Sequence, residues 1–240
     1  VIHHDLMAEI KTYASQCHKA GGIIHLGATS MDALDNGDAV RFLEALELTE
    51  KRLDDLVDAI SEKAEEYKNV PTMAFTHIQP AESTTIGYRL SQTLQDLLDD
   101  REQLVFVKKS IRGKGMKGAV GTAASYKELL SESDISSLDM EKMVMDELGI
   151  KAYDAATQIY SRKQDLRIIE ALSSIACTLH KFSLDFRILQ SPPIGEFSEP
   201  FGKMQVGSSA MPFKRNPINS EKIDSLSRIV ENAYQSAWNN

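Results

Sequence analysis

Apolar residues recur every three or four positions through most of the chain, which is the spacing of one face of an α-helix. The stretches with this spacing are residues 5–20, about 38–67, 80–111, about 138–148, about 162–189 and 216–233. Pro80 fits the first turn of its helix, where a missing N–H costs no hydrogen bond. One stripe is unbroken and consists of Ile168, Leu172, Ile175, Leu179, Phe182, Phe186 and Leu189. Such a stripe predicts packing against other long helices.

Strand signals are nearly absent, because the β-branched residues fall on the helical stripes rather than in alternating runs. The predicted fold class is therefore all-α, an elongated bundle of long helices. Residues 23–37 lack periodicity, and the glycine-rich segment 112–126 cannot continue a helix, since each glycine costs about 1 kcal/mol relative to alanine. Residues 191–217 are too long and too rich in Pro, Gly and Ser for an ordinary connection, so they form a candidate functional loop.

Composition agrees with a globular protein, at 42% hydrophobic and 26% charged residues. No apolar run reaches the roughly 18 residues that cross a bilayer, and the first residues lack a signal-peptide pattern, so we expect no membrane partner. Cys17 and Cys177 show neither a disulfide framework nor metal-ligand spacing, which favours a reducing compartment and a cytoplasmic location. No capping signal precedes His4 and no stop signal ends the chain, which predicts an internal piece of a longer protein.

The net charge of −8 argues against nucleic acid as a partner, because nucleic-acid binders use a basic excess to displace counterions from phosphates. An anionic small molecule would instead need a local cationic pocket. No ligand cluster suggests a metal, and no cofactor is expected.

Such a pocket is predicted in residues 207–217, which read GSSAMPFKRNP. The hydroxyls of Ser208 and Ser209, flexible backbone amides, Lys214 and the start of a helix opened by Asn216 could together hold a carboxylate. The simpler interpretation of these residues is a solvated basic turn with an Asn-Pro cap.

The whole 207–217 string resembles the GSSxMPxKxNP signature of the fumarase and aspartase superfamily, and its KRNP ending is most similar to the adenylosuccinate lyase family. Two further segments agree in order and spacing: GIIHLGATSMDALDN at 22–36 resembles the region of the family's Thr-Ser pair, and MAFTHIQPAESTT at 73–85 resembles that of its Thr-His pair. GAVGTAASY and TQIYSRK are similar as well. The resemblance covers nearly the whole chain and implies a fumarase/aspartase-like bundle.

The resemblance implies catalytic roles for a few residues. Ser208 is the expected base, His77 the acid with Glu221 as its partner, and Lys214 the cation beside the developing negative charge; His4 matches the family's first active-site histidine. The residues expected to bind substrate are His3, Asp5, Thr29, Ser30, Thr76, Gln158, Arg162, Ser209, Met211, Asn216 and Lys222.

Two positions depart from the family's pattern. His3 and Lys222 stand where arginine is expected, and a lysine keeps the charge but loses bidentate geometry. A lone histidine is more often structural than catalytic, which is the interpretation for His18, His25 and His180. Glu199 and Lys203 are expected in a flap without assigned chemistry.

The implied activity is the elimination of fumarate from adenylosuccinate, giving AMP, and from succinylaminoimidazole carboxamide ribotide, giving AICAR. The implied assembly is a homotetramer whose subunits share each active site. Residues 1–29 would end an N-terminal helical domain, residues 30–240 would form an incomplete central bundle, and the C-terminal domain would be absent. Two alternatives stay open: another lyase of the superfamily, of the argininosuccinate or cycloisomerase type, or a non-catalytic helical scaffold of the same fold.

Overall fold

The computed structural model describes residues 3–239, which divide into two units, each with its own interior. The first unit joins Val1–Glu47 to Lys108–Gln164, and the second joins Leu48–Val107 to Asp165–Asn240. The chain therefore leaves the first unit inside one helix, builds part of the second and then returns.

Short elements follow one another in the first unit. They are α1 (Asp5–Gln16), the 3-10 helix η1 (Gly21–Ile23), the start of α2 (Ser30–Glu66), β3 (Arg112–Gly113), α4 (Ala124–Leu129), α5 (Ser137–Glu147) and β4 (Lys151–Ala152). The strands β3 and β4 pair in parallel, with Arg112 opposite Lys151. His4 caps α1, because its Nδ1 accepts a hydrogen bond from the Met7 amide at 3.4 Å. This cap is a helix start signal at a position where the sequence showed none.

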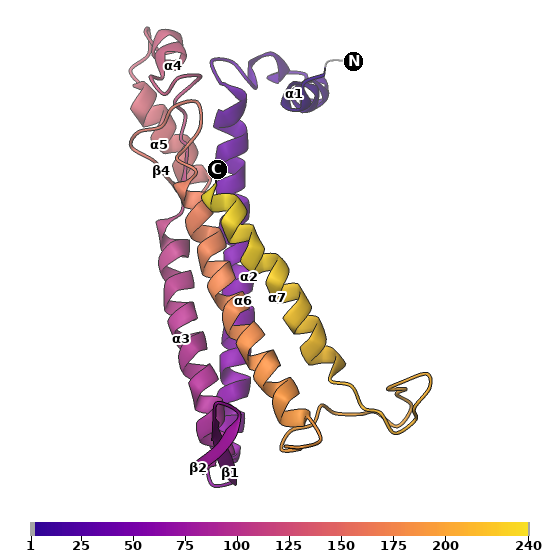
Figure 1. Cartoon of the computed structure of the whole chain (residues 1–240). Coiled ribbons are helices and arrows are strands. Elements are labelled where there is room, and N and C mark those ends of the chain that lie inside the picture. The colour runs from indigo at the N-terminus through magenta and orange to yellow at the C-terminus, as the bar shows by residue number, and fades with distance from the viewer. Residues whose placement is uncertain (1–2, 240) are drawn as a thin grey trace. The chain divides into compact units, whose positions relative to one another are not determined.

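Long helices dominate the second unit, in which neighbours along the chain run antiparallel (Figure 1). Its elements are the rest of α2, β1 (Pro71–Thr76), β2 (Gln79–Thr85), α3 (Ile86–Ser110), α6 (Lys163–Gln190) and α7 (Ile218–Trp238). The predicted apolar stripes supply its interior, whose buried members include Leu53, Ile60, Leu97, Leu104, Ile168, Ala171 and Leu189. Within residues 3–239, no helix is long and apolar enough to span a bilayer.

Polar contacts between the helices fix how they are aligned along one another. Arg101 of α3 forms an ion pair with Asp54 of α2. The buried Asp100 carboxylate accepts hydrogen bonds from Ser174 and Thr178 of α6. Because a buried carboxylate is costly without donors, these bonds favour one alignment of α3 against α6.

Three sequence expectations about boundaries are wrong. Helix α2 begins at Ser30, not near residue 38, because its first turns bury polar rather than apolar side chains. Residues 71–85 form an antiparallel hairpin, with Pro71 opposite Thr85, although hardly any strand was expected. Pro80 therefore lies on β2, where a two-stranded sheet tolerates it at the edge, and α3 begins only at Ile86.

The hairpin turns through His77 and Ile78, which have φ values of +53° and +61°. Positive φ at both central residues, with Thr76 paired to Gln79, is the geometry of a type I′ turn, which favours Asn-Gly. A β-branched residue at positive φ is strained by roughly 1–2 kcal/mol. The turn that carries His77 therefore contains a strained backbone conformation, which the rest of the structure must stabilise.

We expect Ile78→Gly to raise the free energy of unfolding by roughly 0.5–1 kcal/mol, because glycine adopts positive φ without strain. Ile78 is 66% exposed, so little buried surface is lost. Urea denaturation measures the change, with Val120→Gly as the control, since Val120 is also exposed but has an ordinary φ. If Ile78→Gly destabilises as much as the control, the turn is not strained.

Candidate functional site

Residues 207–217, here called the signature loop, fold back on themselves in the second unit. Asn216 Nδ2 donates to the Gly207 carbonyl at 3.2 Å, and the Lys214 amide donates to the Met211 carbonyl at 3.1 Å. A Cβ added at Gly207 would lie 2.0 Å from the Lys214 carbonyl oxygen. Only glycine fits there, so the closure of the loop depends on it.

The Ser208 hydroxyl lies inside this fold. Its Oγ accepts hydrogen bonds from the amides of Ala210 at 3.3 Å and Met211 at 3.2 Å. Two amides that point at one oxygen stabilise negative charge on it, which is what an alkoxide base requires. Ser209 is exposed, and its side chain makes no hydrogen bond within the described part of the chain. The two neighbouring serines thus have different surroundings.

A cavity of about 520 Å³ lies beside the loop. Its walls include three cationic side chains, Arg187, Lys214 and Arg215, together with Asn216. Arg187 is paired with Asp224, and the Arg215 guanidinium lies over the Phe201 ring at 5.2 Å. The volume suits a small-molecule ligand, and the lining favours an anionic one.

The start of α7 is already occupied by a carboxylate. Glu199 Oε1 accepts from the Ser220 amide at 2.8 Å and the Ser220 hydroxyl at 2.7 Å, and Glu199 Oε2 accepts from the Asn219 amide and side chain, both at 3.1 Å. Burial raises the pKa of Glu199, but these hydrogen bonds outweigh burial and leave the pKa below its usual value. Glu199 is therefore a cap of α7, and the expectation that this helix end helps to bind a ligand anion is wrong for the amides that Glu199 covers.

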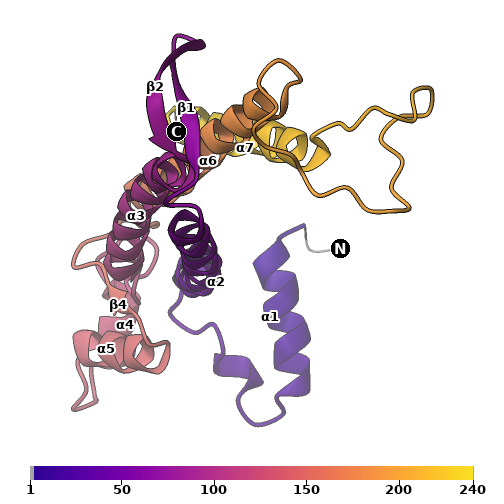
Figure 2. The ribbon, with the colours of Figure 1, turned by 90° about the horizontal axis from the view of Figure 1, so that it is seen from below.

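The other predicted residues of the second unit are exposed. Glu221 and Lys222 lie on the first turn of α7, Met211 lies in the signature loop, and Thr76 and His77 lie at the tip of the hairpin. No contact within residues 3–239 joins His77 to Ser208, Lys214 or Glu221, and both views show the loop extending away from the hairpin (Figures 1 and 2). A single chain does not bring the expected acid and base together.

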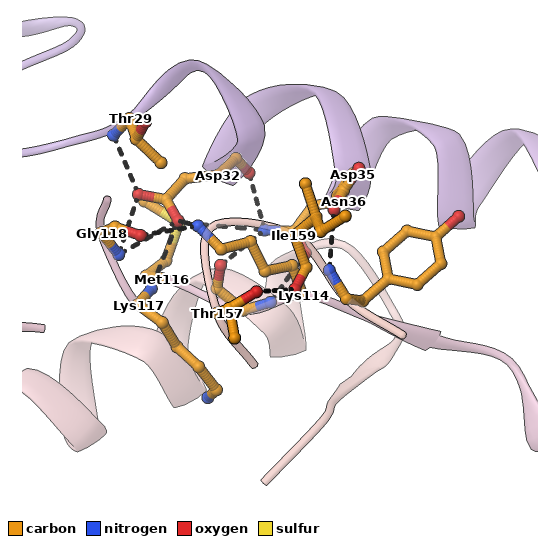
Figure 3. Close-up of polar contacts among 12 residues, drawn as sticks. Thr29, Asp32, Asp35, Asn36, Lys114, Met116, Lys117, Gly118, Thr157 and Ile159 are labelled. Carbon is orange, nitrogen blue, oxygen red and sulfur yellow. Dashed lines mark hydrogen bonds and ion pairs between the residues drawn. The ribbon is translucent and has the colours of Figure 1, made fainter. Parts of the chain in front are cut away.

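In the first unit, the start of α2 is organised by the carboxylate of Asp32, which is 2% exposed (Figure 3). Its donors are the Thr29 amide at 3.1 Å, the Lys114 ammonium, the Lys117 and Gly118 amides and the Tyr126 hydroxyl at 3.0 Å. Lys114 is fully buried and also donates to the Gly118 carbonyl at 2.9 Å. Burial beside this carboxylate raises the pKa of Tyr126. Asp32 thereby fixes the Thr29–Ser30 pair to the glycine-rich segment.

Arg162 is held by a second buried carboxylate of α2. Its Nη2 lies 2.9 Å from Asp35 Oδ1, its guanidinium stacks 4.3 Å from the Tyr160 ring centre, and the Tyr160 amide donates to Asp35 Oδ2 at 3.0 Å. Gln158 is exposed nearby in sequence, and His3, His4 and Asp5 are exposed at the start of α1. Asp32, Asp35 and Lys114 were missed by sequence reasoning.

Comparison with known proteins gives consistent results. A family model described as lyase matches residues 2–231. Adenylosuccinate lyase of Saccharomyces cerevisiae is 37% identical over 238 residues, which cover 99% of this chain and 49% of the relative. That of Schistosoma mansoni is 41% identical over 229 residues, covering 95% of this chain and 47% of the relative. The chain thus spans about half the length of the curated relatives it matches.

Solved structures share the fold. A fumarate lyase from Mesorhizobium sp. BNC1 matches with a TM-score of 0.83 at 22% identity, covering 98% of this chain and 50% of its own. The 3-carboxy-cis,cis-muconate lactonizing enzyme from Pseudomonas putida matches with a TM-score of 0.81 at 26% identity, covering 95% of this chain and 49% of its own. The predicted all-α, fumarase-like fold is confirmed.

Proposed function

Because the chain belongs to the lyase family whose model spans residues 2–231, we propose that it eliminates fumarate from adenylosuccinate, giving AMP, and from succinylaminoimidazole carboxamide ribotide, giving AICAR. The observation that carries this proposal is the identity of 37–41% to adenylosuccinate lyases over nearly the whole chain. The two amides that point at Ser208 Oγ support it, because the reaction needs a base at that position.

In the proposed reaction, Ser208 Oγ as an alkoxide removes a proton from the carbon next to a substrate carboxylate. The released electron pair forms the second carbon–carbon bond of fumarate, and the carbon–nitrogen bond breaks. His77 donates a proton to the departing nitrogen, with Glu221 holding the imidazole charged. Lys214 and the loop amides stabilise the negative charge that develops on the carboxylate. No metal or organic cofactor takes part.

The remaining residues bind and orient the nucleotide and its succinyl carboxylates in this proposal. They are His3, His4, Asp5, Thr29, Ser30, Thr76, Gln158, Arg162, Ser209, Met211, Asn216 and Lys222. The cationic cavity beside the signature loop supports a role for this region in carboxylate binding. Arg162 can serve without losing Asp35, since a guanidinium has five N–H donors.

The activity is tested by incubating the intact protein with adenylosuccinate and measuring fumarate release. Argininosuccinate and 3-carboxy-cis,cis-muconate serve as the competing substrates. Turnover of either competitor without turnover of adenylosuccinate would transfer the assignment to another lyase of the superfamily. A folded protein that turns over none of the three would be a non-catalytic scaffold.

We further propose a homotetramer in which each site combines segments of different subunits. The support is that one chain leaves His77 exposed and without contact to Ser208, and that α7 exposes Leu226, Ile229 and Trp238. Exposed apolar surface of this kind is typical of an interface between subunits.

Mixing two inactive variants tests the shared site. When equal amounts of Ser208→Ala and His77→Gln are dissociated and reassociated together, about a quarter of the sites receive an intact Ser208 and an intact His77, so about a quarter of wild-type activity returns. Light scattering should show a tetramer before and after mixing. If each site forms within one chain, every site keeps one defect and no activity returns.

The location and domain assignment also belong to this proposal. Two free cysteines, Cys17 and Cys177, favour the cytoplasm. Residues 1–29 are assigned to the end of an N-terminal helical domain and residues 30–240 to the central bundle.

A further inference from the structure

A short segment after α6, residues 196–199, is fixed to the last turns of that helix. The amides of Glu196 and Phe197 both donate to the Leu189 carbonyl, at 3.0 and 3.3 Å. The Phe197 ring packs against Phe186, with 5.2 Å between ring centres. These contacts fix residues 196–199 to the end of α6, and this segment is called the base below. The side chains of Glu196 and Glu199 extend from it.

Glu196 reaches the hairpin that carries His77. Its carboxylate pairs with the Arg89 guanidinium of α3, and the Thr72 side chain and the Met73 amide of β1 lie beside it. Arg89 also donates to the Met73 carbonyl. Burial raises the pKa of Glu196, but the bonds from Thr72 and Arg89 outweigh burial and hold the pKa below its usual value. One carboxylate thus ties β1 to both α3 and the segment.

Glu199 reaches in the other direction, to the first turn of α7, through its four hydrogen bonds with Asn219 and Ser220. Its own amide donates to Gln190 Oε1 at 2.8 Å, and Gln190 Nε2 donates to the Arg215 carbonyl at 3.2 Å. Gln190 and Glu199 therefore tie both ends of residues 200–214 to the end of α6. The stretch between these ties contains Ser208.

We propose that Glu196 and Glu199 act together as a clasp, which positions the hairpin of His77 and the loop of Ser208 on one base. This inference rests on the proposed function, because it assigns both glutamates a positioning role in that reaction. Neither glutamate needs to touch substrate. A reacting group displaced by about 1 Å can cost a hundredfold in rate, so a distant tie of this kind affects turnover.

Hydrogen exchange of the intact protein tests the clasp without any substrate. In Glu199→Ala, exchange in residues 200–221 should accelerate at least about fivefold, the factor that loss of a typical helix cap implies. In Glu196→Ala, exchange should accelerate in the hairpin, residues 71–85, and also in residues 200–214. The matched control is Glu82→Ala, which removes an exposed glutamate of β2 and should leave both regions unchanged.

Kinetics separate positioning from simple folding stability. Each alanine variant should lower kcat by roughly 10- to 100-fold while KM changes by less than about threefold, because a small displacement impairs the geometry of proton transfer more than it weakens binding. Glu196→Gln and Glu199→Gln keep the shape of the side chain and should recover part of kcat. These glutamine variants also serve if an alanine variant fails to fold.

Two results would overturn the clasp. The first is that Glu196→Ala accelerates hydrogen exchange only in the hairpin and leaves residues 200–214 unaffected. The second is that both alanine variants keep a kcat within about twofold of wild type. If wild-type protein does not turn over adenylosuccinate, the proposed function fails by itself, and the exchange pattern still decides whether the two elements are coupled.

Discussion

Ser208→Ala should bind adenylosuccinate with little loss, yet turn it over at least about a thousandfold more slowly. The substitution removes the oxygen toward which the amides of Ala210 and Met211 point, while Gly207 still closes the loop against Lys214. Solvent can satisfy the two freed amides, because both residues are exposed. Steady-state kinetics and equilibrium binding of adenylosuccinate measure the two effects separately.

Ser209→Ala is the matched control, since it removes the neighbouring hydroxyl, which is exposed and makes no hydrogen bond to residues 3–239. Ser209→Ala should lower turnover less than Ser208→Ala does. Exchange of the substrate's β proton with solvent is the direct readout, because a variant without the base loses exchange together with elimination. If Ser208→Ala keeps wild-type exchange and Ser209→Ala abolishes it, the second hydroxyl is the base.

His77→Gln should lower turnover by roughly 100- to 10,000-fold, the usual contribution of a general acid, with a much smaller effect on nucleotide binding. His77 is exposed at the tip of the hairpin, so the substitution removes the acid without leaving a cavity. Glutamine is also not β-branched, so it adds no new strain of the kind found at Ile78. The pH profile of kcat should lose the limb that reports the acid.

His18→Gln is the control for His77→Gln, because His18 is also exposed and has no proposed role. It should leave turnover within about twofold of wild type. Near-normal turnover of His77→Gln with only a raised KM would make His77 a binding residue. The acid would then have to be another histidine, with His4 the first candidate.

Apolar spacing predicted the elements whose packing is apolar. The expected helix at about 162–189 is α6, Lys163–Gln190, and the expected short helix near 138–148 is α5, Ser137–Glu147. Helix α6 buries Ile168 and Leu189 of its stripe, so period and burial agree there, whereas α5 buries Met145 but leaves Leu138 exposed. The long irregular segment before α7 was likewise predicted, because Pro and Gly cannot continue a helix.

The start of α2 could not be predicted in this way, since it is stabilised by polar contacts between distant parts of the chain. Asp32 is 82 positions from Lys114, and Asp35 is 127 positions from Arg162. Such partners leave no periodic trace in the sequence. The hairpin was missed for a related reason: its strands do not alternate strictly, and Glu196 fixes β1 from more than a hundred positions away.

The candidate residues came from the sequence, but their surroundings did not. Motif resemblance singled out Ser208 and His77, and spacing gave no means of knowing that two amides converge on Ser208 or that His77 lies in a strained turn. The role of Glu199 was hidden because its partners, Asn219 and Ser220, lie beyond the loop that separates them in sequence.

The discontinuous first unit has a consequence for biosynthesis. A ribosome that adds about 5–20 residues per second completes residues 1–47 several seconds before it reaches residue 108, where this unit resumes. During that interval, Asp32 has been synthesised but Lys114 has not, so the carboxylate stays hydrated and the start of α2 lacks its anchor. The first unit can close only after Gln164 has been added, by which time part of the second unit already exists. The unit whose synthesis starts first is therefore not able to complete its folding before synthesis of the other unit has started.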